Sequence, residues 1–171
     1  MTQTVTHSLD AKYYTDPEVF RIEQDGLLAR TWQFAGHSSQ LENVGDYFAF
    51  EMAGESLFCI KGRDQVIRTF YNVCQHRAHQ LVSGTGTTRV VVCPYHAWTY
   101  ELTGGLRAGP NINSVEGFDK SKICLTEVRT ELFLGFVFVN LDKDAKPMDE
   151  WFPNARTELT QWVPHFESLK P

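Results

Sequence analysis

The chain has 171 residues, of which 42% are hydrophobic and 22% are charged, and its formal net charge is −5 at pH 7. These proportions are those of an ordinary globular domain and argue against disorder or a fibrous structure. The negative net charge argues against a nucleic-acid binder. The sequence contains no run of eighteen apolar residues, so no membrane span is predicted. Residues 1–10 lack the apolar core of a secretory signal, so a cytoplasmic protein is expected.

A helix is predicted close to the N-terminus, after a polar segment that ends at Thr15. Asp16 can accept hydrogen bonds as an N-cap residue, and Pro17 suits the first helical position. Apolar residues then recur at helical spacing, which predicts a helix over 17–31. This helix belongs to an expected N-terminal segment over 1–40.

A β-rich region is predicted next, over 41–142. Short aromatic and β-branched runs that alternate with glycine-containing turns are typical of antiparallel strands. The expected strands are residues 47–52, 56–61, 66–71, 89–93, 99–102 and 132–140. Tight turns are expected at 53–55, 62–64 and 103–105, and loops at 83–88 and 107–122.

The last part of the chain, residues 143–171, is predicted to be a helical connector with a helix over 149–163. Its Trp151, Phe152, Leu159 and Trp162 make this helix too apolar for a solvated tail. The helix either covers the β core, which is the favoured interpretation, or docks on protein outside this chain.

Four residues carry the chemistry: Cys74 and His76, followed by Cys93 and His96. The pattern is Cys-x-His, sixteen intervening residues and Cys-x-x-His, and each pair follows a predicted strand. Two thiolates and two imidazoles can hold one tetrahedral zinc ion, or a two-iron cluster with the cysteines on one iron and the histidines on the other. Each loop supplies one donor of each type, whereas a zinc finger draws both cysteines from one knuckle, so the spacing favours the cluster.

Other reactive residues have structural interpretations. Cys59 and Cys124 lie in apolar runs and are predicted to be small core residues. His79 is predicted to be a surface or turn residue. Arg77 is predicted to fix its loop, with contact to a reductase as the alternative.

The residues around the four donors resemble a known family. Residues 72–81 (NVCQHRAHQL) and 93–100 (CPYHAWTY) resemble the two cluster loops of Rieske non-haem iron oxygenases. Residues 135–141 (GFVFVNL) are similar to the last strand of the family's Rieske domain, and the resemblance covers about 16–165. It implies a mainly β fold, a Rieske-type antiparallel β sandwich with a small cluster-binding subdomain and flanking helices.

The resemblance also implies a [2Fe–2S] Rieske cluster bound by Cys74, His76, Cys93 and His96. Ala78 and Ala97 stand where family members commonly have glycine, and this narrows the backbone angles available there.

The resemblance bears on the reduction potential as well. Respiratory Rieske proteins have a disulfide between two further cysteines, and His79 and Tyr95 occupy the corresponding positions here. Trp98 stands where those proteins have a serine hydroxyl, and Trp98 and Tyr100 are expected to pack under the second loop. Fewer donors to the sulfurs imply a potential toward the low end of the Rieske range.

The implied function is one-electron transfer, with electrons supplied by a flavin- or ferredoxin-containing reductase and passing over the exposed edges of His76 and His96. In the family, a mononuclear Fe(II) held by two histidines and a carboxylate does the oxygen chemistry in a C-terminal domain. That domain is expected beyond Pro171, in an enzyme that forms a homo-oligomer such as a trimer. This chain is therefore expected to be part of an oxidoreductase, a mono- or dioxygenase, and not to be catalytically competent alone.

Two other functions remain open, a free-standing Rieske ferredoxin-type carrier and a structural zinc-binding module. The amino-acid sequences of the two loops resemble those of the family branch that oxidises quaternary ammonium compounds more than those of the branch that oxidises aromatic rings.

Overall fold

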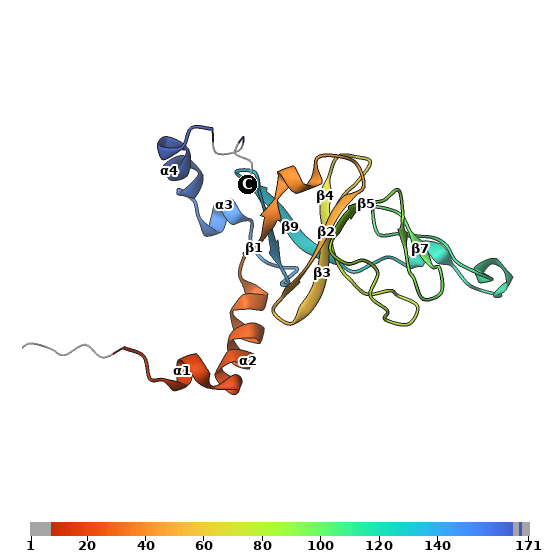
Figure 1. The fold of residues 1–171 in the computed structure, drawn as a ribbon, viewed down its shortest axis with the longest axis horizontal. Coiled ribbons are helices and arrows are strands. Elements are labelled where there is room, and N and C mark those ends of the chain that lie inside the picture. Colours follow the sequence, from red (N-terminus) through yellow and green to blue (C-terminus); the bar gives the residue numbers. More distant parts are fainter. Residues whose placement is uncertain (1–7, 166–167, 169–171) are drawn as a thin grey trace, which may run out of the picture.

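The computed structural model describes residues 8–165 and Ser168, and its centre is a curled antiparallel sheet (Figure 1). Helices lie at one end of this sheet, and a small second sheet lies at the other. The expected mainly β class, with flanking helices and a small subdomain, is confirmed. None of the helices in the described part of the chain is long and apolar enough to cross a membrane.

Two helices precede the sheet. α2 (Pro17–Gly26) begins as predicted, because the Asp16 carboxylate accepts the Glu18 N–H at 2.9 Å and proline occupies the first turn. The predicted helix over 17–31 ends early, and a 3₁₀ turn over Leu28–Arg30 follows. A short helix α1 (Lys12–Thr15), which was not predicted, forms within the polar segment that precedes α2.

The main sheet has seven strands in the order β1-β10-β9-β4-β3-β2-β5, and all neighbours are antiparallel. Its strands are β1 (Gln33–His37), β2 (Asp46–Met52), β3 (Glu55–Lys61), β4 (Ile67–Tyr71), β5 (Thr85–Thr87), β9 (Glu127–Phe133) and β10 (Phe136–Asn140). The predicted meander of β2, β3 and β4 is confirmed to within a residue at most ends. A 3₁₀ turn over Ser38–Leu41 connects β1 to this meander.

The prediction of one long strand over 132–140 is wrong, because the chain forms a hairpin there. Strands β9 and β10 pair from Phe133 with Phe136, which leaves Leu134 and Gly135 as a two-residue turn. Both turn residues have positive φ, 51° and 85°, as the tightest hairpin turns require. The hairpin places β10 between β9 and β1, so β1 is the edge strand on that side of the main sheet.

The second sheet consists of three short strands, β6 (Val91–Val92), β7 (Thr99–Tyr100) and β8 (Leu106–Ala108). The first two are shorter than the predicted strands, and β8 was not predicted. β5 replaces part of the loop expected over 83–88, and β1 was also missed. Two 3₁₀ turns, Ile112–Ser114 and Lys120–Lys122, lie in the long connection that leads back to β9.

The C-terminal helix is interrupted. α3 (Met148–Trp151) and α4 (Ala155–Trp162) replace the single helix predicted over 149–163, and Pro153 lies between them. Met148 is buried against Trp32 and Phe133, so this region does cover part of the β core. Trp162 is 83% exposed and extends beyond that contact.

One buried cluster connects the main sheet to the small sheet. It contains Phe58 and Phe70 from β3 and β4, together with Cys74, Cys93 and Tyr100 from the loops and small sheet. Burial of such side chains stabilises a fold by about 1.5–3 kcal/mol each. The loops are thus anchored in the same core that holds the strands together.

The two remaining cysteines differ. Cys59 is fully buried and contacts the Thr69 hydroxyl at 3.1 Å, and burial raises the pKa of its thiol to about 12, so its prediction as a core residue is confirmed. The same prediction for Cys124 is wrong, because its side chain is exposed. Cys124 forms an isolated bridge with Gly105, and the next residue, Leu125, is buried in the core.

Candidate metal centre

The two predicted loops have nearly the same backbone path. In the first, Cys74 N–H donates to the carbonyl five residues later at 2.9 Å, and Ala78 N–H donates back to the Cys74 carbonyl at 2.9 Å. The second loop repeats both hydrogen bonds at the same spacings, from Cys93 N–H at 2.8 Å and from Ala97 N–H at 3.0 Å. Each cysteine is therefore fixed by main-chain hydrogen bonds within its own loop.

The two alanines adopt the conformation that glycine prefers. Ala78 has φ 54° and Ala97 has φ 56°, so both lie in the left-handed region. An alanine in that region costs about 1–2 kcal/mol relative to the right-handed conformation. The expectation of narrowed backbone freedom at these positions is confirmed, and each loop contains one strained residue.

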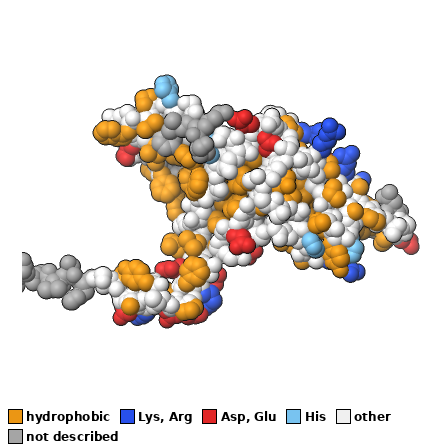
Figure 2. All heavy atoms as spheres, viewed as in Figure 1, with side chains coloured by type: hydrophobic (Ala, Val, Ile, Leu, Met, Phe, Trp, Pro, Cys, Tyr) orange, Lys and Arg blue, Asp and Glu red, His pale blue; other side chains and the backbone are white. Residues whose placement is uncertain are grey.

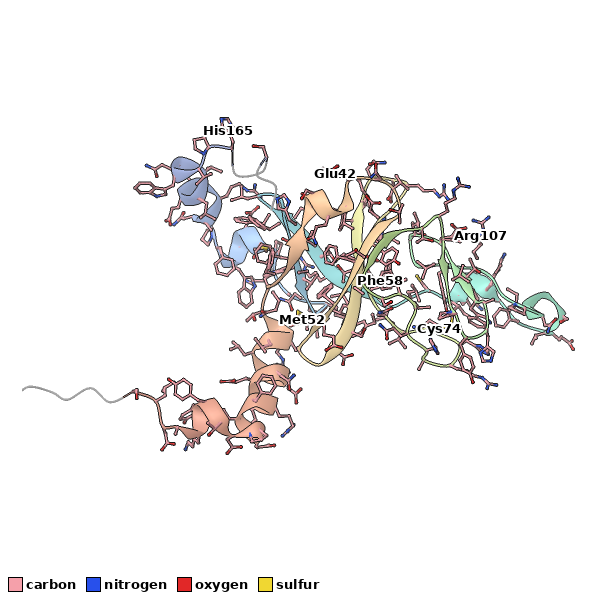
Figure 3. The ribbon with its side chains drawn as sticks, viewed as in Figure 1. Glu42, Met52, Phe58, Cys74, Arg107 and His165 are labelled. Carbon is pink, nitrogen blue, oxygen red and sulfur yellow. The ribbon has the colours of Figure 1, made fainter. Side chains whose placement is uncertain are left out.

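The loops bring the predicted donors together at the end of the molecule opposite the helices, where Figure 3 labels Cys74. Cys74 and Cys93 are each 2% exposed and belong to the same buried cluster. The rings of His76 and His96 face each other edge to face, with centroids 4.9 Å apart. The donors are thus arranged as an inner pair of thiols and an outer pair of imidazoles. Among the described residues, no three His, Cys, Asp or Glu side chains are grouped so that they could hold a single metal ion.

His96 has a nitrogen available for a metal. Its Nδ1 atom is buried and makes no hydrogen bond to any described residue. Burial lowers the pKa of His96, and the nearby side chains of His76, Arg77 and His79 lower it further. A neutral imidazole with a buried, unpartnered nitrogen fits the chemistry of a metal ligand.

Aromatic side chains support both imidazoles. The ring of Trp98 stacks on that of His76 with centroids 4.7 Å apart and planes 8° apart, and Trp98 is itself buried. On the other side, the ring of Tyr95 lies 3.8 Å from that of His96. The prediction that Trp98 packs under the second loop is confirmed.

Tyr100 does more than pack. Its hydroxyl accepts the Gln75 N–H at 3.0 Å and lies 3.2 Å from the Cys74 sulfur, so its own proton can be donated to that sulfur. Burial, and then the neighbouring Cys74, raise the pKa of Tyr100, and the phenol keeps its proton. No sequence pattern indicates this hydrogen bond, because it joins Cys74 in the first loop to Tyr100 in β7, 26 positions away.

Asn72 holds the first loop in place, and sequence reasoning missed it. Its buried side-chain oxygen accepts the N–H groups of Leu81 and Val82, each at 3.0 Å. Its side-chain nitrogen donates to the Val82 carbonyl at 2.8 Å. One amide therefore ties the beginning of the loop to its end.

Arg77 and His79, which follow His76 in the first loop, are both exposed. His79 contacts the Gln80 carbonyl through Nδ1 at 2.6 Å, which agrees with its prediction as a surface residue. Arg77 makes no hydrogen bond or ion pair with any residue that the structure describes. The prediction that Arg77 fixes its loop is therefore wrong, because main-chain bonds and Asn72 do so.

A family model for the Rieske [2Fe–2S] domain matches residues 31–119, which include both loops and most of the main sheet. The chain belongs to the Rieske [2Fe–2S] domain family. The expected [2Fe–2S] cofactor and the expected resemblance to Rieske oxygenases are confirmed by this match and by the relatives below.

Three relatives show which Rieske proteins this chain is similar to. The carnitine monooxygenase oxygenase subunit of Escherichia coli (strain K12) is 41% identical over 95% of this chain and 44% of its own length. The 2-aminobenzenesulfonate 2,3-dioxygenase subunit alpha of an Alcaligenes species is 37% identical over 88% of this chain and 39% of its own length. A crystal structure of the quaternary ammonium Rieske monooxygenase CntA with its substrate gamma-butyrobetaine has a TM-score of 0.89 at 37% identity, over 95% of this chain and 47% of that one. The chain thus spans less than half the length of each.

Proposed function

We propose that Cys74, His76, Cys93 and His96 hold a [2Fe–2S] cluster and that the domain transfers one electron at a time. The observation that carries the proposal is the arrangement of the donors, with two buried thiols and two imidazole rings 4.9 Å apart. Cysteines on the inner iron and histidines on the outer iron would match that arrangement. The unpartnered Nδ1 of His96 supports it.

The bound cluster would supply a one-electron couple, and the protein's own residues prepare for it in three ways. The loop backbone fixes both sulfurs through hydrogen bonds within each loop. Trp98 and Tyr95 hold the imidazole planes, and the Tyr100 phenol can donate to the Cys74 sulfur. The buried surroundings of the sulfurs exclude water, while the exposed His76 ring gives an electron a short route to the surface.

We further propose that the domain receives electrons from a flavin- or ferredoxin-containing reductase and serves an oxygenase. The mononuclear iron that reacts with oxygen would lie in a catalytic domain of the same homo-oligomer. The relatives named above as oxygenase subunits support this role.

Quaternary ammonium compounds are the proposed substrate class of that oxygenase. The carnitine monooxygenase subunit is 41% identical, whereas the benzene 1,2-dioxygenase subunit alpha of Pseudomonas putida is 29% identical over a similar share of the chain. An oxygenase that contains this domain should consume oxygen when given carnitine, a reductase and the reductant that supplies the reductase with electrons. Oxygen consumption with benzene and not with carnitine would overturn this substrate class.

The cluster itself is tested by spectroscopy of the purified chain, with iron, sulfide and zinc assayed together. We expect a red-brown protein with two irons and two sulfides per chain and a Rieske-type electron paramagnetic resonance (EPR) signal after reduction. A colourless protein with one zinc per chain would identify the structural zinc module instead.

Two variants test the ligand assignment. His96→Ala should abolish the EPR signal, because it removes one of two ligands from the outer iron. Cys59→Ser is the matched control, since Cys59 is buried in β3, outside both loops, and its thiol lies against the Thr69 hydroxyl. Loss of the signal in Cys59→Ser, or its survival in His96→Ala, would contradict the assignment.

A further inference from the structure

Gly109 lies where the chain leaves β8 and begins the connection to β9. Its φ is outside the left-handed region, so its backbone conformation does not require glycine. Space does require it, because a Cβ atom at this position would lie 2.8 Å from Cδ1 and 2.9 Å from Nε1 of Trp98. Carbon atoms in contact are ordinarily about 3.5–4.0 Å apart. The main chain at Gly109 is therefore packed directly against the edge of the indole ring.

Other residues of this connection also hold the indole. The ring of Phe118 meets that of Trp98 edge to face, with centroids 6.0 Å apart. Asn111 has φ 60°, so the chain turns soon after Gly109, and Ile112 then enters the buried cluster that contains Trp98. Trp98 is left 8% exposed. Its position is thus determined by the connection after β8 as well as by its own loop.

Trp98 joins that connection to the first candidate loop. It lies at the end of the second loop, directly before β7, but its ring stacks on that of His76 in the first loop, with centroids 4.7 Å apart and planes 8° apart. His96 differs, because the ring close to it belongs to Tyr95 of its own loop. The orientation of His76 therefore depends on a side chain that Gly109 helps to hold.

The ring of His76 has few other restraints. His76 is exposed, and its side chain makes no hydrogen bond to any residue that the structure describes. Both imidazoles line a hollow of about 490 Å³, which the connection after β8 also borders. Figure 2 shows His and hydrophobic side chains next to one another on the surface at the end of the molecule opposite the helices. An exposed side chain keeps its rotamer freedom unless a neighbour packs on it, so the stack on Trp98 is what limits the tilt of His76.

We propose that Gly109 is a positioning residue for the cluster: its lack of a side chain lets the connection hold Trp98 against His76, and Trp98 fixes the plane of that imidazole. The proposal rests on the function proposed above and adds how one iron ligand is oriented from outside both loops. Groups that orient a ligand also tune its metal. The orientation of His76 should therefore affect the EPR g-values of the reduced cluster and the ease with which iron is lost.

A single methyl group tests the contact. Gly109→Ala should leave the iron content unchanged, move the g-values of the reduced holoprotein, and make bleaching by a chelator roughly fivefold faster. Gly105→Ala is the matched control, because it adds the same methyl group to the same small-sheet region, where a Cβ atom would have nothing within 4 Å and φ is likewise ordinary. It should match the parent in both measurements. A purely structural role of Gly109 would lower stability without moving the g-values.

Two further variants trace the route through the indole. Trp98→Leu removes the stack and should move the g-values by itself, and adding Gly109→Ala to it should cause no further shift, because the two changes act on one contact. Phe118→Leu loosens Trp98 without adding an atom beside it. It should also move the g-values and should make bleaching about twofold faster.

The outcomes separate this proposal from the proposed function. A parent without a Rieske EPR signal would overturn the function itself. A parent with that signal, together with unchanged g-values in both Gly109→Ala and Phe118→Leu, would overturn the positioning role alone. A comparable shift in Gly105→Ala, or a further shift when Gly109→Ala is added to Trp98→Leu, would overturn it as well, because the effect would then not pass through the indole.

Discussion

The hydrogen bond between Tyr100 and Cys74 gives a direct test of how the protein sets the potential of the proposed cluster. Tyr100→Phe removes the hydroxyl that lies 3.2 Å from the sulfur and leaves the ring in its buried position. A donor to sulfur stabilises the reduced cluster more than the oxidised one, because the reduced cluster carries more negative charge. Its loss should therefore lower the reduction potential.

The magnitude follows from the strength of such a bond. A hydrogen bond to a charged group contributes about 1.5–3 kcal/mol, of which the difference between the two redox states is roughly 1 kcal/mol. One kcal/mol corresponds to about 40 mV for a one-electron couple, because a tenfold change in equilibrium is 59 mV. Since the pKa of Tyr100 is raised, the phenol stays protonated, and the shift should be the same at pH 6 and pH 8.

The assay is a redox titration in which the EPR signal is recorded at each potential, with two controls. Tyr47→Phe removes a hydroxyl from a half-buried tyrosine of β2 and should leave the potential unchanged. Iron content should be equal in all three proteins. A potential in Tyr100→Phe that equals or exceeds that of the parent would show that the phenol does not donate to the sulfur.

Other predictions concern stability and titration. Ala78→Gly and Ala97→Gly should each raise the free energy of unfolding in urea by roughly 0.5–1 kcal/mol, since glycine removes the left-handed strain; a loss of stability would contradict the backbone argument. Asn72→Leu should lower that free energy by about 3 kcal/mol, because it leaves buried N–H groups without acceptors, and a change below 1 kcal/mol would mean that the loop has other anchors. The carboxyl of Asp64 should titrate near pH 2 in NMR, since its hydrogen bond with Arg68 lowers its pKa from 3.8 to about 2. Its contribution to stability is then complete above pH 3.8 and lost as the pH falls through 2, and in Arg68→Met the titration should move back toward 3.8, whereas an unmoved titration would rule out this partner.

Short sequence patterns correctly predicted the start of the N-terminal helix and the turns between the strands of the meander, because neighbouring residues determine these features. Asp16 and Pro17 begin α2 where expected, and the glycine turns separate β2, β3 and β4 at the predicted residues. The four candidate donors were selected from the sequence because their spacing within each loop is a local property. Both loops indeed follow short strands and lie together.

Features that depend on distant contacts were missed. The β9–β10 hairpin turns at Leu134 and Gly135, and a leucine with positive φ does not resemble the Asn-Gly pairs by which such turns are recognised. β5 is a short polar edge strand whose residues Thr85–Thr87 read as a loop until they pair with β2. The Tyr100 hydroxyl and the Cys74 sulfur are 26 positions apart in the chain, so only the folded structure reveals their contact.

The matching main-chain hydrogen bonds in the two loops have a consequence for assembly of the holoprotein. Each loop closes on itself without help from the donor side chains, so the polypeptide presents a preorganised cradle before any iron arrives. Insertion of the cofactor then orders little additional chain, in contrast to small zinc domains that are unfolded without their ion. A chelator should accordingly bleach the protein while its far-ultraviolet circular dichroism is retained, and added iron and sulfide should restore the colour.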